Sequence, residues 1–198
     1  MTTMRARSGE ERKARIEQIA LELFRTRGFD QVTVEELCAG AGVGPATFYR
    51  HFGTKEAVVF SYRDAFVAEL RAATEATADL PEPARLPAVV GRFAAYLESL
   101  SGMLAARDEI VKGHPRLLQR TLCIQRDMEA ELAEGLARSR GLPAPDARAR
   151  LEAGLGVLVL RMAVRTWRAG EAGSLPGAVE EAWKSLRTLV CEERTDDR

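Results

Sequence analysis

The stretch from Val43 to Glu56 constrains the fold of this chain more than any other segment. It reads Val-Gly-Pro-Ala-Thr-Phe-Tyr-Arg-His-Phe-Gly-Thr-Lys-Glu. A short helix is expected to begin near Pro45, because proline at a first helical position loses no hydrogen bond. Phe48 and Phe52 share one face of that helix, which leaves polar and aromatic groups on the other face. A short helix anchored on one side and open on the other is typical of the recognition helix in a helix-turn-helix domain.

Two more helices are predicted before this segment. The apolar residues of the first recur at i, i+3, i+4, i+7 and i+8: Ile16, Ile19, Ala20, Leu23 and Phe24. The second begins at Thr33, and Glu36 three residues later completes a capping box. The formal net charge is zero, so any attraction to nucleic acid must come from local charge. The N-terminal arm and first helix supply such charge: Arg5, Arg7, Arg12, Lys13 and Arg15.

The rest of the chain also predicts helices only. A fourth helix is expected to begin after Thr54 and to run unbroken for about 25 residues, until Pro81 and Pro83 end it. Glycine and proline then separate five further segments. These segments are 84–101, 103–112, 115–140, 146–169 and 176–193. The predicted fold class is therefore all-α, with about nine helices.

Several functional classes find no support in the residues. Three cysteines lie far apart, and the only histidines are His51 and His114, so no metal-ligand or disulfide pattern is present. No nucleophile–base pair is visible, so we expect neither an enzyme nor a cofactor. Charged residues interrupt the apolar stretch 151–167, which argues against a membrane span. The first residues lack the apolar stretch of a signal peptide, so we expect none. We expect a cytoplasmic protein.

Residues 10–60 resemble the tetracycline-repressor (TetR) family of bacterial regulators. The motifs that carry the resemblance are Val32-Thr33-Val34 and the run Thr47-Phe48-Tyr49-Arg50-His51-Phe52 followed by Thr54-Lys55-Glu56. Gly44 departs from the family, because many members have Ser or Thr there. The resemblance implies a helix-turn-helix domain with a basic arm at 1–55 and a ligand-binding and dimerisation domain at 56–198.

The function implied is that of a homodimeric repressor, which binds a palindromic operator and is released by a small-molecule effector. The alternatives are an activator or a ligand-binding helical adaptor. By resemblance, one group of residues is expected to face phosphate: Thr33, Tyr49, His51 and Lys55. A second group lies at the front of the recognition helix and is expected to contact bases: Pro45, Ala46 and Thr47, with Arg50 as a further long donor.

The C-terminal half predicts an effector pocket and a dimer interface. The expected pocket lining is Tyr62, Phe66, Phe93, Tyr96, Leu97, Ile124, Gln125, Met128, Met162 and Arg161, although core packing explains the apolar members equally well. The segment 108–141 is similar to family members that sense acyl-coenzyme A, so the effector is expected to be acyl-CoA-like or hydrophobic. The expected dimer interface is Leu151, Leu155, Leu158, Trp167 and Trp183. A helix apolar on two sides must bury both, in a dimer or in the core of a monomer. Arg161 and Arg165 are expected either to form structural ion pairs or to bind an acidic ligand.

Overall fold

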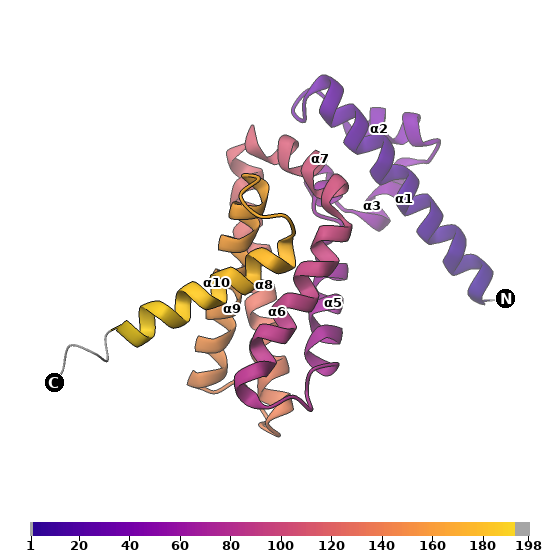
Figure 1. Cartoon of the computed structure of the whole chain (residues 1–198). Coiled ribbons are helices and arrows are strands. Elements are labelled where there is room, and N and C mark those ends of the chain that lie inside the picture. Colours follow the sequence, from indigo (N-terminus) through magenta and orange to yellow (C-terminus); the bar gives the residue numbers. More distant parts are fainter. Residues whose placement is uncertain (1, 193–198) are drawn as a thin grey trace. The chain divides into compact units, whose positions relative to one another are not determined.

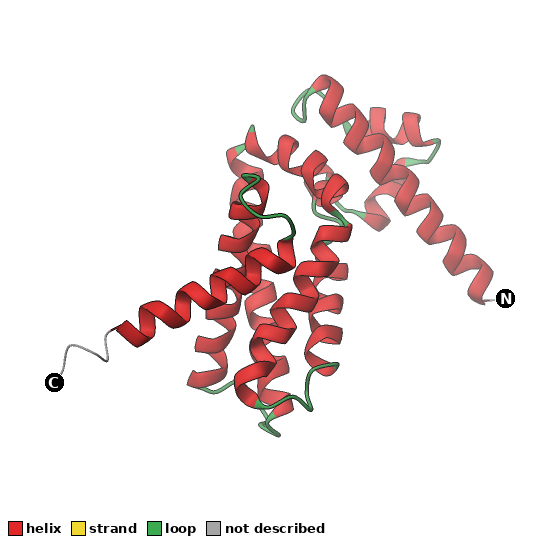
Figure 2. Cartoon of the chain, in the orientation of Figure 1, coloured by secondary structure: helices red, strands yellow, loops and turns green. Residues whose placement is uncertain are grey.

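The computed structural model describes residues 2–192, with side chains described from 9 to 190. Within that range all regular elements are helices, as Figure 2 shows, which confirms the all-α prediction. There are ten in this part of the chain: α1 (Thr2–Arg27), α2 (Val34–Ala41), α3 (Pro45–His51), α4 (Lys55–Val59), α5 (Arg63–Glu75), α6 (Glu82–Ser99), α7 (Ser101–Lys112), α8 (Pro115–Ser139), α9 (Ala147–Arg168) and α10 (Leu175–Glu192). No helix among these residues is long and apolar enough to span a bilayer.

The predicted fourth helix is two helices, and the expectation of one unbroken helix was wrong. α4 and α5 are separated by a turn at residues 60–62. The stretch 55–75 has no proline or glycine, so nothing local predicts this turn. It is stabilised from elsewhere, since Nε of Arg107 donates to the carbonyl of Val59 at 3.0 Å. In a continuous helix that carbonyl would accept from the amide four residues later.

The chain divides into two compact units. The first comprises the chain up to Asp64 together with Gly102–Thr121, and the second comprises Ala65–Ser101 and the chain from Leu122 onward. Figure 1 traces this course, with α5 and α8 each contributing residues to both units. The first packing unit thus includes α4 and α7 besides the three predicted helix-turn-helix elements. A functional boundary after residue 55 stays a prediction.

In the first unit α1 packs on α2 and α4, and α2 packs on α3. The interior side chains include Ile16, Leu37 and Phe48, all essentially inaccessible to solvent. Gly40 allows α2 to approach α1 closely, because a Cβ at this position would lie 2.9 Å from Cγ2 of Ile19. The recognition helix α3 is therefore held by a dense apolar base.

In the second unit α6, α9 and α10 pack against one another. α9 turns a row of small residues inward, and Gly156 fits so tightly that a Cβ there would lie 3.0 Å from both Leu132 and Leu86. The close approach that Gly156 permits is thus made within one chain. The opposite side of α9 is left for other contacts.

Candidate nucleic-acid interface

Thr33 begins α2 through a reciprocal pair of hydrogen bonds. Its hydroxyl accepts from the backbone N–H of Glu36 at 3.2 Å, and its own N–H donates to the Glu36 carboxylate at 2.8 Å. The other carboxylate oxygen accepts from Arg27 at 2.7 Å. These bonds, the one from the Thr33 backbone most, hold the pKa of Glu36 below its ordinary value. The predicted capping box is confirmed, while a phosphate contact by the exposed Thr33 stays a prediction.

The turn between α2 and α3 sets the direction of the recognition helix. Gly42 ends α2 with φ at 65°, a left-handed conformation that glycine adopts without strain. Gly44 then precedes α3 without a side-chain capping bond, and Pro45 takes the first helical position as predicted. This glycine–proline chemistry lets two short helices meet at a sharp angle, as a helix-turn-helix requires.

α3 has one buried face and one open face. Phe48 is fully buried, and its ring centre lies 5.5 Å from that of Phe52 and 5.7 Å from that of Tyr49. Tyr49 is 51% exposed, which confirms its predicted outward orientation. The residues predicted to contact bases are exposed or, for Thr47, partly exposed: Pro45, Ala46, Thr47 and Arg50.

His51 and Lys55 lie where α3 ends and α4 begins. The Nε2 atom of His51 is buried and has no hydrogen-bond partner within the described residues. The ammonium of Lys55 donates to the carbonyls of Phe29, at 2.9 Å, and Val32, at 3.1 Å. It also lies 4.5 Å from the centre of the Phe29 ring. An ammonium has three donors, and two of those of Lys55 fix the chain ahead of α2. A phosphate contact by Lys55 stays a prediction.

Comparisons with known proteins agree with this geometry. Residues 18–62 match the family described as bacterial regulatory proteins, tetR family. The chain is 34% identical over 181 residues to the HTH-type transcriptional regulator TcmR of Streptomyces glaucescens, which covers 85% of this chain and 79% of that protein. The chain belongs to the TetR family. This TetR-family protein is a transcriptional regulator. The family match, at residues 18–62, includes α2 and α3.

Solved structures place its fold in the same family. A TetR-family regulator from Syntrophomonas wolfei superposes with a TM-score of 0.59 at 15% identity, over 91% of this chain and 95% of that one. FadR of Thermus thermophilus, a TetR-family repressor solved with lauroyl-CoA, gives a TM-score of 0.50 at 25% identity, over 90% and 93% of the two chains. The all-helical architecture of the regulator is therefore that of its family.

The predicted effector-lining residues are only partly gathered. The rings of Phe66, Phe93 and Tyr96 form a cluster with centre distances of 5.7 and 6.0 Å. Burial raises the pKa of the Tyr96 phenol. Three other members of the set are buried in the second unit: Leu97, Ile124 and Met128.

The remaining members of that set are placed differently. Tyr62 belongs to the first unit, and Gln125 is partly exposed. Arg161 and Met162 are exposed on α9. The aromatic cluster is thus the part of the prediction that the structure brings together, and its role in binding stays a prediction.

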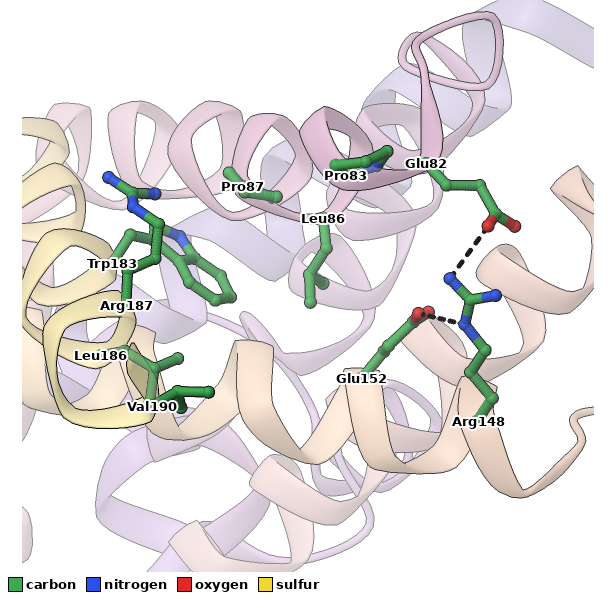
Figure 3. A pocket seen from close by; sticks show the side chains of 10 residues that line it. All are labelled: Glu82, Pro83, Leu86, Pro87, Arg148, Glu152, Trp183, Leu186, Arg187 and Val190. Atoms are coloured by element: carbon green, nitrogen blue, oxygen red, sulfur yellow. Dashed lines mark hydrogen bonds and ion pairs between the residues drawn. The ribbon is translucent and has the colours of Figure 1, made fainter. Parts of the chain in front are cut away.

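A groove of about 490 Å³ lies between α6, α9 and α10 of the second unit. In Figure 3 the indole of Trp183 lies at one end and an ion-pair cluster at the other. Arg148 donates to Glu82 and to Glu152, each at 2.9 Å, and Arg140 bonds to the same two carboxylates. The Arg140 bond is the largest cause that lowers the pKa of Glu82. None of the residues predicted to bind the effector lines this groove.

The outer side of α9 exposes a row of large apolar residues. Leu151 is 73% exposed, and Leu158 and Met162 are each 42% exposed. Leu155, predicted in the same row, is partly exposed, as is Trp167. Trp183 is buried within its own chain, and Nε1 of its indole has no partner among the described residues.

Leu189 and Val190, near the end of α10, are two further exposed apolar residues, and they were not predicted. They are 65% and 64% exposed. In Figure 1 the C-terminal end of α10 runs past the helices on which it packs. The two residues lie on the last turns of the helix. Local sequence does not show whether a neighbouring helix covers such residues, so their exposure could not be predicted.

Arg107 is the other residue that the sequence did not indicate. It is 3% exposed, and burial lowers its pKa. Besides Val59, it donates to Ser61 at 3.1 Å and to Glu17, which lies 90 residues earlier, at 3.2 Å. Such long sequence separations leave no local signal.

Proposed function

We propose that this protein is a homodimeric transcriptional repressor that binds a near-palindromic DNA operator through α3. The observation that carries the proposal is the open face of α3, with Tyr49 half-exposed over a fully buried Phe48. An outward aromatic residue on a rigid base is available to a ligand without loss of folding energy. A DNA-binding protein acts where the chromosome lies, so we propose that this protein acts in the cytoplasm. Binding an operator needs no catalytic group.

The contacts separate into two kinds. We propose that Tyr49, His51, Thr33 and the remaining donor of Lys55 bind phosphate and set the register on DNA. The uncapped front of α3 then presents Pro45 and Ala46, which offer apolar contact to a thymine methyl, and Thr47, which also offers a hydrogen bond. Nε2 of His51 lacks a partner within the described residues although a buried polar atom is normally hydrogen-bonded, so a phosphate contact through this atom requires the imidazole to turn toward solvent.

Dimerisation is supported by the exposed apolar row on α9. Soluble monomers rarely expose contiguous large apolar surfaces, and Leu151, Leu158 and Met162 follow one another along a single helix face. With Leu189 and Val190 they provide the side chains for a helical interface between two copies. Two-fold symmetry then places the two recognition helices about one DNA turn, or a multiple of it, apart.

The effector is proposed to be a molecule with a hydrophobic portion that binds at the Phe66–Phe93–Tyr96 cluster. Aromatic walls with one phenol hydroxyl suit an apolar ligand that carries a polar group. The lauroyl-CoA complex of FadR supports an acyl-CoA thioester as the first class to test. An effector that binds the DNA-free conformation better than the DNA-bound one would release the operator.

To test the proposal, DNA duplexes that bind the protein are selected from a random pool. The most enriched duplex is then titrated with the protein, and binding is measured by fluorescence polarisation at two salt concentrations. We expect the most enriched duplex to be palindromic. The affinity of the protein for this duplex should fall as the salt concentration rises, because bound phosphates release counterions. Tyr49→Ala should lower the affinity about tenfold or more. Leu118→Ala, an exposed position on α8, is the matched control. No enriched sequence, or equal binding by Tyr49→Ala, would contradict the proposal.

A further inference from the structure

The groove between α6, α9 and α10 has the size and lining of a small-molecule site. Its volume of about 490 Å³ lies within the range of roughly 300–1,000 Å³ that is typical of ligand pockets. All of its walls belong to the second unit. The polar side chains that line the groove lie at its two ends, as Figure 3 shows, so its middle suits an apolar body. Six of its ten lining residues are apolar: Pro83, Leu86, Pro87, Trp183, Leu186 and Val190.

The end of the groove formed by α6 and α9 is neutralised by its own residues. Arg148 donates to Glu82 and to Glu152, each at 2.9 Å. Arg140, which does not line the groove, binds the same two carboxylates. Two guanidinium groups thus balance two carboxylates. A charged ligand finds no uncompensated charge at this end.

The α10 end of the groove instead holds two hydrogen-bond donors without acceptors in the part of the chain that the structure describes. Nε1 of Trp183 is buried and unpartnered, and the whole side chain is 7% exposed. Arg187 is exposed, and its guanidinium makes no hydrogen bond or ion pair with a described residue. The two residues are one helical turn apart on α10, and Figure 3 shows their side chains next to each other. A buried N–H without an acceptor is costly, so this end favours a group that accepts hydrogen bonds and carries negative charge.

We propose that this groove binds a small apolar carboxylic acid. The carboxylate pairs with the guanidinium of Arg187, which can donate two parallel hydrogen bonds to it, and also accepts the indole N–H of Trp183. The long side chain of Arg187 is exposed, so it can move to admit the carboxylate to the indole. The hydrocarbon body of the acid lies along Leu86 and Leu186. The aromatic cluster contributes no residue to the groove, so this is a second site, separate from the proposed effector site and independent of DNA binding.

The test titrates the full chain, labelled with 15N, with decanoate and with its uncharged counterpart decanol. The chain has two tryptophans, and the indole signal that Trp183→Phe removes is the one from Trp183. We expect decanoate to shift this indole N–H signal downfield in a saturable way, because the carboxylate accepts its hydrogen bond. Decanol offers no charge to Arg187, so it should bind more weakly and shift the signal less.

Variants then assign the affinity to the two donors. Arg187→Gln should lower the affinity for decanoate about tenfold, because a hydrogen bond between charged groups is lost, and should leave the affinity for decanol unchanged. Trp183→Phe keeps an aromatic wall but removes the N–H, and it should weaken decanoate binding in isothermal titration calorimetry. The control is Arg150→Gln, at an exposed arginine of α9 that does not line the groove and should bind decanoate as the wild type does.

Three results would overturn the proposal. Decanoate that saturates the protein without moving the Trp183 signal binds elsewhere, for example at the aromatic cluster. Equal decanoate affinity in Arg187→Gln and the wild type would exclude the guanidinium as its partner. A second copy of the chain is the other candidate occupant, since Val190 in the groove wall is 64% exposed. Decanoate binding by a monomeric Leu158→Glu variant, but not by a dimeric wild type, would assign the groove to a subunit contact. None of these measurements uses DNA, so a failure of the proposed function leaves them unaffected.

Discussion

Charged residues of this regulator often bind groups of their own chain, and Glu131 is the clearest case. It is 6% exposed and accepts two bonds from Arg71, at 2.9 and 2.8 Å, and one from Arg138 at 3.0 Å. These bonds, with Arg71 the largest cause, hold the pKa of Glu131 below its ordinary value. Arg71 joins α5 to α8 through this carboxylate, while Arg138 lies on α8 itself.

Glu131→Gln should lower the free energy of unfolding by about 1–3 kcal/mol at neutral pH. The folded pKa lies below the unfolded one, so the carboxylate stabilises the fold fully above its unfolded pKa of about 4.3. That contribution is lost as the pH falls through the folded pKa, and we expect a shallower loss of stability below about pH 5 in the variant. Urea unfolding at a series of pH values measures both effects. Glu134→Gln, at a more exposed carboxylate, is the control.

Lys55 provides a second residue-scale prediction. Lys55→Met keeps the apolar stem but removes both hydrogen bonds to the Phe29 and Val32 carbonyls. The free energy of unfolding should fall by about 1–2 kcal/mol, and operator affinity should fall as well. Tyr49→Ala, at an exposed side chain, should alter affinity alone. Unchanged stability in Lys55→Met, measured by urea unfolding, would show that the ammonium does not bind these carbonyls in solution.

At the scale of helices, features with local causes could be predicted. The Thr33–Glu36 capping box, Pro45 at the start of α3 and the outward side of Tyr49 follow from residues at most four positions apart. The turn at 60–62 could not be predicted, because the group that stabilises it lies on α7. The aromatic cluster could be proposed from apolar spacing, but spacing does not show which predicted lining residues come together.

Gly135 on α8 is a close contact between two helices. A Cβ at this position would lie 2.6 Å from Cγ2 of Thr74 on α5, too close for either atom to remain in place. Gly135→Ala should therefore reduce stability by about 1–3 kcal/mol in urea unfolding. Thr74→Ser removes Cγ2, so the double variant should recover part of the loss. If the loss of stability in the double variant equalled the sum of the losses in the two single variants, this packing would be contradicted.

For the whole molecule, the exposed row on α9 predicts that two copies associate. Leu158→Glu places a charge at the centre of that row and should convert a dimer into a monomer in sedimentation velocity. The affinity for the operator should fall as well, because each half-site is then bound by a separate monomer. Leu118→Glu, an equally apolar and exposed position on α8, should leave the dimer intact. A dimer that survives Leu158→Glu would place the interface elsewhere.

This TetR-family protein is expected to recognise a particular DNA sequence. The most direct measurement compares its affinity for the selected palindrome with that for a scrambled duplex of equal length and composition, at one salt concentration. We expect an affinity ratio of about 1,000 or more. A ratio near one would mean that α3 contacts only the DNA backbone, which would contradict sequence recognition.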